Sequence, residues 1–298
     1  MIDKSRGQAF GLLFLTFFLW GSVYVGGKLL TQELSPALVA CLRCSTAMVP
    51  LLLMARPHLR TKVQREDWKY FILVGVLGYF LTIFLIQIGI ALTGSAMASL
   101  INALTPVSVT ILAALLLKET ITPVKLLCLA LALAGTAVIT QGAGSQSELL
   151  GIAAVLISVV FWGFASVFMR RLTAKYPAVL VTTYGMAISL IFHIPAGILA
   201  YASQPVAFTP KIVLVVLYLG FFGSGVAQYT WTRCLSILPA STCSLFYPLQ
   251  PVFAALLGAV ILKETFTSTF AIGLALISLD VVLSTWETKK LAEAKEQK

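Results

Sequence analysis

The sequence predicts an all-α integral membrane protein with ten transmembrane helices, arranged as two inverted five-helix (5+5) repeats. Three observations favour this fold. Of the 298 residues, 59% are hydrophobic and 11% are charged, whereas about a quarter of a soluble domain is charged. The apolar residues gather into ten runs, each near the ~20 residues that a helix needs to cross a bilayer. Short motifs of the first half also recur in the second half. A water-soluble fold is excluded, because one core cannot bury this much apolar surface.

Short polar connections such as Thr31–Ser35 and Thr93–Ser95 join the ten runs and leave little chain for a further domain. In chain order the runs lie at 9–30, 36–54, 70–92, 96–117, 123–140, 149–169, 178–201, 211–236, 240–262 and 266–286. The first run is too long for the apolar core of a signal peptide and lacks a clear small-residue cleavage site, so we expect it to be retained as a helix. Residues 287–298 are expected to form a charged cytoplasmic tail.

The positions of the 21 Lys and Arg residues predict the orientation. With ten crossings and both termini in the cytoplasm, all but four of them fall in cytoplasmic segments. Lys28, Lys211 and Lys263 fall on the opposite side, and Arg43 lies within a run. This asymmetry agrees with the positive-inside rule, and one helix more or fewer would destroy it. The net charge of +10 is therefore attributed to loops facing anionic lipid, and nucleic acid is not expected as a partner.

The two halves of the sequence repeat each other. Leu117–Thr120 (Leu-Lys-Glu-Thr) recurs as Leu262–Thr265, and the Trp-Gly pair at Trp20 recurs at Trp162. Each half holds five runs, an odd number, so the second half must enter the membrane from the opposite side. Inverted repeats of this kind enclose a site near the midplane that can open alternately to either face. The pattern favours transport.

Two of the repeated features carry a resemblance to a known family. Each half has a Trp-Gly pair in its first helix (Trp20, Trp162) and a proline in its fourth helix (Pro106, Pro251), which a Lys-Glu-Thr turn closes. In order, spacing and duplication these features resemble the drug/metabolite transporter (DMT) superfamily, EamA-type permeases, over 9–286.

The resemblance implies two EamA-like repeats, at 9–140 and 149–286. It also implies an exporter of small metabolites such as amino acids in a bacterial inner (plasma) membrane. The central cavity would lie between helices 1–4 and 6–9, with helices 5 and 10 at the periphery. A small-molecule substrate and membrane lipid are the expected partners, no cofactor is expected, and a homodimer is left open.

Polar and aromatic side chains form matching stripes on the first and sixth helices. Trp20 and Tyr24 lie four residues apart, as do Trp162 and Ser166, so each pair shares a helix face. Polar stripes have no reason to face lipid, and we expect both to line the cavity. The alternative is hydrogen bonding between helices, with tryptophan anchored at the membrane interface. Trp20 and Trp162 lie halfway along their runs, which argues against an interfacial anchor.

Pro106 and Pro251 lie at the midpoints of the fourth and ninth runs. Because proline has no amide hydrogen, each is expected to free the carbonyl four residues earlier, at Asn102 and Tyr247. Freed backbone at membrane depth is tolerated where it is buried in protein or lines a wet cavity. We therefore predict helix breaks with a gating role, and we place Asn102, Tyr247 and Ser99 in the site. The alternative is a kink that only shapes packing.

The third and eighth helices offer further aromatic and amide side chains that suit a substrate with an apolar side and hydrogen-bonding groups. These candidates are Tyr79, Gln87, Gln228 and Tyr229. Arg43 in the second helix could pair with a carboxylate or phosphate, or could extend to the outer face. Tyr184 is its equivalent in the second repeat, so the charge is not duplicated.

Three carboxyl groups are candidates for proton coupling, because an ionisable group at membrane depth is by default a functional candidate. Asp280 lies in the tenth helix, where a structural role is the alternative. Glu119 and Glu264 lie at helix ends beside lysines, where local capping or pairing is the alternative.

No pattern typical of an enzyme is present in the sequence. Cys41 and Cys44 form a C-x-x-C inside an apolar run without a second ligand pair, and the chain has two histidines, His58 and His193. We therefore predict no metal site and no catalytic residues.

The sequence leaves several functions open. Export of amphiphilic metabolites is expected first. Efflux of cationic drugs coupled to protons, and exchange of phosphorylated or nucleotide-linked sugars, are alternatives within transport. A membrane sensor that does not transport is the alternative from another class.

Overall fold

The computed structural model describes residues 2–123 and 145–263, together with scattered positions between 126 and 134 and between 272 and 279. All secondary structure in these residues is helical. The segments of the first half are α1 (Ile2–Thr31), α2 (Pro36–Ala55), η1 (Arg56–His58), η2 (Arg65–Asp67), α3 (Trp68–Leu73), η3 (Val74–Leu81), α4 (Thr82–Thr93), α5 (Ser95–Asn102) and α6 (Thr105–Leu117).

The second half follows the same general order, from a long first helix onward. Its segments are α8 (Gln146–Thr173), α9 (Ala178–Ser203), α10 (Pro210–Tyr218), η4 (Leu219–Val226), α11 (Ala227–Ile237), α12 (Ala240–Ser244), α13 (Leu249–Leu257) and η5 (Gly258–Leu262).

Within the described residues, the segments join into eight helical stretches that are long and apolar enough to cross a membrane. They are Gly7–Thr31, Pro36–His58, Arg65–Thr93, Ser95–Leu117, Gln146–Thr173, Ala178–Ser203, Pro210–Ile237 and Ala240–Leu262. Each overlaps one of the predicted runs. The predicted fifth and tenth helices (123–140 and 266–286), the tail, and the candidates Glu264 and Asp280 lie outside the part that the structure describes.

Both fourth helices of the repeats are interrupted near the proline, but the proline is not in the interior of a continuous helix as predicted. The first interruption separates α5 from α6, and Pro106 lies in the first turn of α6. The second separates α12 from α13, and Pro251 lies in the first turn of α13. A proline in the first turn costs little, because the amide hydrogens there lack helical partners anyway. A break ahead of each proline therefore takes the place of a kink.

Two backbone features occur at equivalent places in both halves. The third and eighth predicted helices each contain a π-helical segment, η3 and η4, and the two segments begin at equivalent residues, Val74 and Leu219. Lys118 and Lys263 end their helices in the left-handed conformation, with φ of 57° and 55°. The duplication seen in the sequence therefore extends to the irregular backbone.

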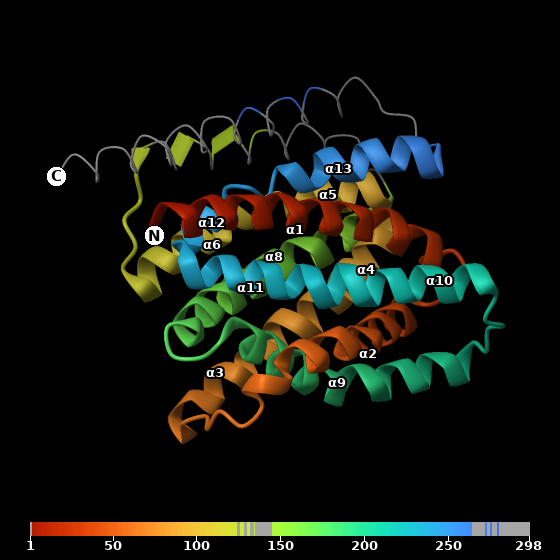
Figure 1. Ribbon diagram of the computed structural model, residues 1–298. Coiled ribbons are helices and arrows are strands. Elements are labelled where there is room, and N and C mark those ends of the chain that lie inside the picture. Colours follow the sequence, from red (N-terminus) through yellow and green to blue (C-terminus); the bar gives the residue numbers. More distant parts are fainter. Residues whose placement is uncertain are drawn as a thin grey trace.

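The equivalent ends of the two halves lie at opposite ends of the bundle. Glu119, just after α6, contacts the first residues of α12, so the stretch that ends at Leu117 and the stretch that begins at Ala240 meet at one end. The latter stretch then crosses the bundle, so that Lys118 and Lys263 lie far apart. Figure 1 shows the end where α1 begins at the left and the α9–α10 connection at the right. We call these the N-terminal end and the far end.

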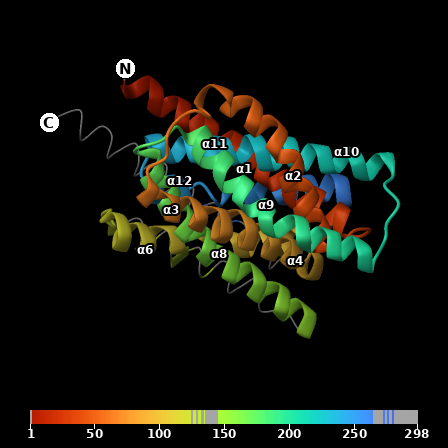
Figure 2. The same cartoon turned by 90° about the horizontal axis from the view of Figure 1, so that it is seen from below.

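Close helix packing brings the two halves together. Figure 2 shows α2 beside α9, and these helices pack along each other as α4 and α8 do. The π-helical segment η4 packs on α2 through Gly220. A Cβ atom built on Gly220 would overlap Thr46 Oγ1 and would lie 3.0 Å from the Arg43 carbonyl oxygen. Glycine is therefore required for this close approach.

The opposite directions of the two halves predict from which side of the membrane a cysteine in each connection can be labelled. In a chain whose five cysteines are replaced, we expect a cysteine at Ser145 to react with an impermeant maleimide added outside intact cells. A cysteine at Lys118 should react only after the cells are permeabilised. Both positions are exposed, which makes them a matched pair. Labelling of both from the same side would contradict the inverted arrangement.

Candidate functional site

A cavity of about 430 Å³, including space open to solvent, lies between the two halves. Four helical stretches of the first half and three of the second half contribute its polar and aromatic lining. The lining residues are Trp20, Val23, Tyr24, Arg43, Thr82, Ile83, Ile86, Asn102, Trp162, Gln228, Tyr247 and Gln250.

The cavity is displaced toward the far end of the bundle. Arg43 lies in the eighth position of α2, which starts at the far end, and Ile86 lies in the half of its stretch that ends there at Thr93. Trp20 and Trp162 lie near the middle of α1 and α8. At a rise of about 1.5 Å per residue, Arg43 is roughly 10 Å along α2 from its first residue. The site therefore spans the middle of the bundle and the adjoining part of its far half.

Several polar atoms of the lining have no hydrogen-bond partner among the described residues. They include Trp20 Nε1, the Tyr24 hydroxyl and Gln228 Oε1, and each of these residues is buried. A buried polar group without a partner costs free energy, on the order of 1–3 kcal/mol. A bound molecule that supplies an acceptor to the indole and hydroxyl groups, and a donor to the amide oxygen, would recover this cost.

Arg43 is the cation of the cavity and is buried, with 3% of its surface exposed. Its Nε donates to Ser224 Oγ at 2.8 Å. In the described part of the chain the one ion pair joins two other residues, so no described carboxylate neutralises Arg43. A buried guanidinium without a counter-ion favours an anionic group in the adjoining cavity.

The two helix breaks meet at the cavity through a pair of amide side chains. Asn102 Nδ2 donates to Gln250 Oε1 at 2.9 Å, and this bond joins the end of α5 to the start of α13. The carbonyls that the prolines were predicted to free are both occupied. The Thr105 hydroxyl donates to the Asn102 backbone carbonyl at 2.6 Å, and the Gln250 backbone N–H donates to the Tyr247 backbone carbonyl at 2.9 Å. Side chains at the breaks, and not free carbonyls, therefore face the cavity.

Five aromatic rings lie between the cavity and the N-terminal end, and we call them the aromatic floor. They are Phe17, Trp20, Trp162, Trp231 and Tyr247. The ring centroids of Phe17 and Tyr247 are 4.8 Å apart, and those of Trp20 and Trp162 are 5.7 Å apart. Phe17 and Trp231 are fully buried and lie outside the cavity lining. The floor therefore separates the cavity from the N-terminal end.

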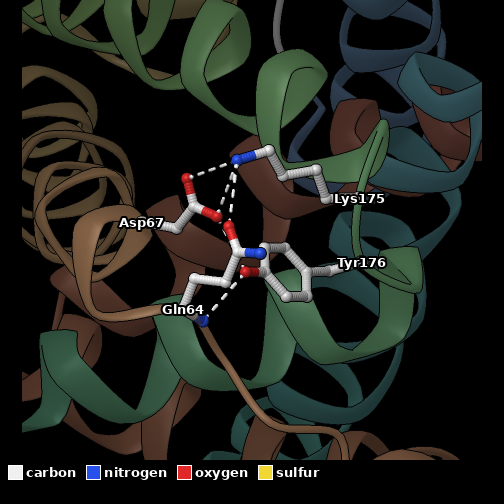
Figure 3. A network of polar contacts seen from close by, with 4 residues as sticks. All are labelled: Gln64, Asp67, Lys175 and Tyr176. Carbon is white, nitrogen blue, oxygen red and sulfur yellow. Dashed lines mark hydrogen bonds and ion pairs between the residues drawn. The ribbon is translucent and has the colours of Figure 1, made fainter.

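A second layer of contacts joins the two halves at the N-terminal end, and we call it the clasp (Figure 3). Asp67 belongs to the first half. Its carboxylate forms an ion pair with Lys175 Nζ at 3.0 Å and accepts a hydrogen bond from the Tyr176 hydroxyl at 2.7 Å, and both partners lie in the connection between α8 and α9. The backbone N–H of Gln64 donates to the Tyr176 hydroxyl oxygen at 3.0 Å. Burial raises the pKa of the Tyr176 phenol, so the hydroxyl keeps the proton that it donates. The clasp joins the two halves.

Glu119 also joins the halves at this end. Its carboxylate accepts from the backbone amides of Ala240 and Ser241 at 3.0 and 3.2 Å, and from the Ser241 hydroxyl. The first amides of a helix lack internal partners and carry the positive end of the helix dipole, so a carboxylate is stabilised there. This arrangement is a helix cap, the role that the sequence left open beside proton coupling.

At the far end of the bundle, the positions that correspond by the repeat to the clasp residues Asp67 and Lys175 are apolar. A Pro-Ala pair begins at Pro36 in the first half and at Pro177 in the second, and counted from it Lys175 corresponds to Leu34. Counted from the paired π-helical segments, Asp67 corresponds to Ile212. Leu34 and Ile212 belong to one buried cluster that also includes Leu38. The two ends of the bundle are therefore held by different kinds of contact.

The structure brings about half of the predicted binding residues to the cavity. Those in the lining are Trp20, Tyr24, Arg43, Asn102, Trp162, Gln228 and Tyr247. Those outside it are Tyr79, Gln87, Ser99, Ser166, Tyr184 and Tyr229.

The residues outside the lining have other surroundings. The Ser99 hydroxyl donates to the Ala96 carbonyl at 2.8 Å, and the Tyr79 hydroxyl contacts Met169 Sδ. Tyr184 stacks on Trp68 at the N-terminal end, so the equivalence with Arg43 does not extend to the site. Gln87 and Ser166 are buried, and their side-chain polar atoms lack partners within the described residues.

Sequence reasoning missed two polar residues of the lining. Thr82 follows η3, and its hydroxyl donates at 2.8 Å to the Leu77 carbonyl, which also accepts the Thr82 backbone amide in the π-helical turn. Nothing in the sequence marks the π-helical turn. Gln250 stands beside Pro251 in an apolar run, and a glutamine in such a place is a signal for a lined cavity.

The arrangement can hold a small amphiphilic molecule. It presents one cation, several unpaired hydrogen-bonding atoms and a wall of aromatic rings. Among the residues that the structure describes, no group of three or more His, Cys, Asp or Glu could hold a metal ion.

Comparison with known proteins adds the family. A model of the EamA-like transporter family matches residues 8–141 and again residues 149–286, once for each half. A solved crystal structure is similar with a TM-score of 0.73 and 22% sequence identity, and the match covers 93% of this chain and 98% of the other. That likeness concerns the fold.

Relatives of similar length carry transporter names. A protein of Archaeoglobus fulgidus, named as an uncharacterized transporter, is 26% identical over 91% of this chain and 96% of its own length. The transporter YetK of Bacillus subtilis is 27% identical over 93% of this chain and 86% of its own. A protein of Streptantibioticus cattleyicolor, named as a probable terminal-alkyne amino-acid exporter, is 28% identical over 86% of each. These similarities extend along most of each chain.

Proposed function

Because the chain belongs to the EamA-like transporter family, we propose that it exports small amphiphilic metabolites across the bacterial inner membrane by alternating access, with amino acids as the leading class. The observation that carries the proposal is the cavity between the two halves, whose lining combines Arg43, unpaired polar atoms and aromatic rings. Such a surface fits a molecule with a charged or polar end and an apolar body.

In this mechanism the N-terminal end faces the cytoplasm. The clasp and the aromatic floor part to admit the substrate, and they close again before the cavity opens at the far end. The polar clasp joins the halves at the N-terminal end, and the apolar cluster of Leu34 and Ile212 joins them at the far end. Separate contacts at the two ends suit a cycle in which the halves rock about a central site. Both termini would lie in the cytoplasm, as the charge distribution favours.

Amino acids are favoured by two lines of support. The relative from Streptantibioticus cattleyicolor is named as a probable amino-acid exporter. The lining also offers a cation for a carboxylate, and aromatic faces and an amide oxygen for an ammonium group. Coupling to protons through Asp280, Glu119 or Glu264 stays a prediction. The capping contacts of Glu119 favour a structural role for that residue.

Counterflow in proteoliposomes tests the proposal. Vesicles loaded with one compound at a time from a panel of amino acids and related amphiphiles would be diluted into the same labelled compound. We expect accumulation of labelled amino acids that requires the protein. A pH gradient imposed in a parallel series would reveal coupling. If no compound accumulates while the protein is folded and inserted, the proposal is wrong.

Two variants test whether the cavity is the route. Trp162→Ala removes a ring of the aromatic floor, and Asn102→Ala removes the bond to Gln250. We expect each to lower counterflow about tenfold or more, because each disrupts contacts at the substrate surface. Unchanged kinetics in both variants, at equal insertion, would count against this site.

The other functions make different demands. Exchange of phosphorylated or nucleotide-linked sugars would need several cationic side chains in the cavity to bind the phosphates. Among the described lining residues, Arg43 is the one cation. Efflux of cationic drugs would need an accessible acid such as Asp280, and loss of resistance in Asp280→Asn at unchanged expression would favour it. A sensor would bind compounds of the panel without moving them.

A further inference from the structure

We propose that the cavity selects its substrate by charge, taking small molecules that carry one carboxylate, held by Arg43, and a nitrogen donor directed to Gln228. The inference rests on the proposed function and narrows its substrate class to zwitterions with an apolar body. Organic cations without a carboxylate are excluded.

The first step is the electrostatic state of Arg43. Its guanidinium lines the cavity, is buried, and has a neutral hydroxyl, Ser224 Oγ, as the partner of Nε. Inside the described chain no carboxylate shares the site with it. A second cation brought into the cavity would be repelled, whereas a carboxylate would form charge-assisted hydrogen bonds with the planar guanidinium. The cavity therefore discriminates between ligands by the sign of the charge that they place beside Arg43.

The second step is the inventory of unpaired atoms around the same cavity. Trp20 Nε1 can only donate, and the Tyr24 hydroxyl can donate, so both suit acceptor atoms of a ligand. Gln228 Oε1 can only accept, so it calls for an N–H or O–H donor. All three atoms belong to residues of the lining and are buried. A ligand with both a carboxylate and an ammonium group satisfies this set, and one with a carboxylate alone leaves Gln228 unsatisfied.

The third step is the apolar part of the ligand. Val23, Ile83 and Ile86 line the cavity together with the faces of the aromatic floor. A compact apolar side chain would bury its surface there, and aromatic faces also stabilise a nearby ammonium group. A highly hydrated body such as a sugar would lose its water to this surface without replacement hydrogen bonds.

Three ligands built on one scaffold separate these demands. L-phenylalanine carries both charged groups, 3-phenylpropanoate carries only the carboxylate, and 2-phenylethylamine carries only the ammonium group. Binding to the purified full-length protein in nanodiscs would be followed by tryptophan fluorescence. We expect L-phenylalanine to bind most tightly, 3-phenylpropanoate about tenfold more weakly, and 2-phenylethylamine not measurably. Equal binding of the amine and the amino acid would overturn the proposal, as would failure of both carboxylates to bind.

Variants assign each preference to a residue. Arg43→Gln should weaken both carboxylates about 10- to 100-fold, as expected for the loss of a charged hydrogen-bond partner, and Arg43→Lys should restore part of the loss. Gln228→Leu should weaken L-phenylalanine and leave 3-phenylpropanoate nearly unchanged. Lys211→Gln is the control, because it removes one exposed cation that is not part of the cavity lining. Wild-type affinity for both carboxylates in Arg43→Gln would overturn the assignment.

Binding and counterflow together keep this inference distinct from the proposed function. Selective binding without flux would overturn export and leave the charge selection standing. Flux of amino acids that is equally fast in wild type and Arg43→Gln would support export and overturn the charge selection. If Arg43→Gln does not fold, the ligand series on the wild-type protein decides, since it needs no variant.

Discussion

Replacing Asp67 by asparagine is expected to open the N-terminal end of the bundle to water-soluble reagents. Asp67 is the shared acceptor of the clasp, since both Tyr176 and Lys175 donate to its carboxylate. Lys175 is half exposed, so its ion pair contributes less than about 1 kcal/mol. The buried hydrogen bond from Tyr176 to a charged oxygen contributes more, on the order of 1.5–3 kcal/mol. Asparagine retains a neutral acceptor, so we expect a net loss of about 1–2 kcal/mol, which corresponds to a roughly 5- to 30-fold shift in the opening equilibrium.

A cysteine at Met169 would report the opening. Met169 is fully buried and lies two turns beyond Trp162 along α8, on the clasp side of the floor. In a background without other cysteines, its maleimide labelling rate should rise about tenfold in Asp67→Asn. Glu66→Gln is the matched control, because it removes the same charge from the exposed neighbouring residue. Equal labelling rates in both variants would show that the clasp does not hold this end closed.

The second large effect is expected from Gly220→Ala. The added Cβ would overlap Thr46 Oγ1 and would lie 2.6 Å from Thr46 Cβ and 3.0 Å from the Arg43 carbonyl oxygen. Because α2 and η4 pack along their length, the backbones cannot separate at one residue alone. We expect destabilisation of about 1–3 kcal/mol, the usual range for overpacking, and weaker ligand binding, since α2 carries Arg43.

Gly11→Ala provides the control for that change. Gly11 lies on an exposed face of α1, and a Cβ built there meets nothing within 4 Å. Alanine is the better helix former by up to about 1 kcal/mol, so this variant should be as stable as wild type or slightly more so. Thermal unfolding of both variants in detergent, followed by tryptophan fluorescence, measures the difference. Similar midpoints would mean that the η4–α2 contact is looser than the geometry indicates.

The helices could be predicted because each depends on local information. A stretch of twenty apolar residues bounded by polar ones fixes both the existence and the length of a membrane helix. The described stretches overlap the corresponding predicted runs for this reason. The repeat was equally visible, because Lys118 and Lys263 occupy the same place in the same four-residue motif.

Residues of the cavity could be predicted where an unusual side chain stands in an apolar run. Arg43, Asn102 and Gln228 are of this kind and line the cavity, whereas Gln87 is of the same kind and lies outside the lining. Serines and tyrosines are less informative, since they satisfy themselves locally or pack in the core. Ser99, which bonds to the preceding turn, illustrates the difference.

The clasp could not be predicted, because its partners are more than 100 residues apart in the chain. Asp67 lies beside Glu66 in a polar connection, and nothing in the sequence distinguishes the buried acid from the exposed one. Only the packing of the α8–α9 connection against this loop selects Asp67. The π-helical segments escaped prediction for a related reason, since their extra residue leaves the apolar pattern almost unchanged.

The clasp is polar and the contact at the far end is apolar, so two different solution conditions can shift the equilibrium between opening at one end and opening at the other. Electrolyte screens the attraction between Lys175 and Asp67, so concentrated salt weakens the polar end. The Leu34 and Ile212 cluster responds little to ions but loses strength on cooling, as apolar burial does. Ionic strength and cold therefore tip the same equilibrium in opposite directions.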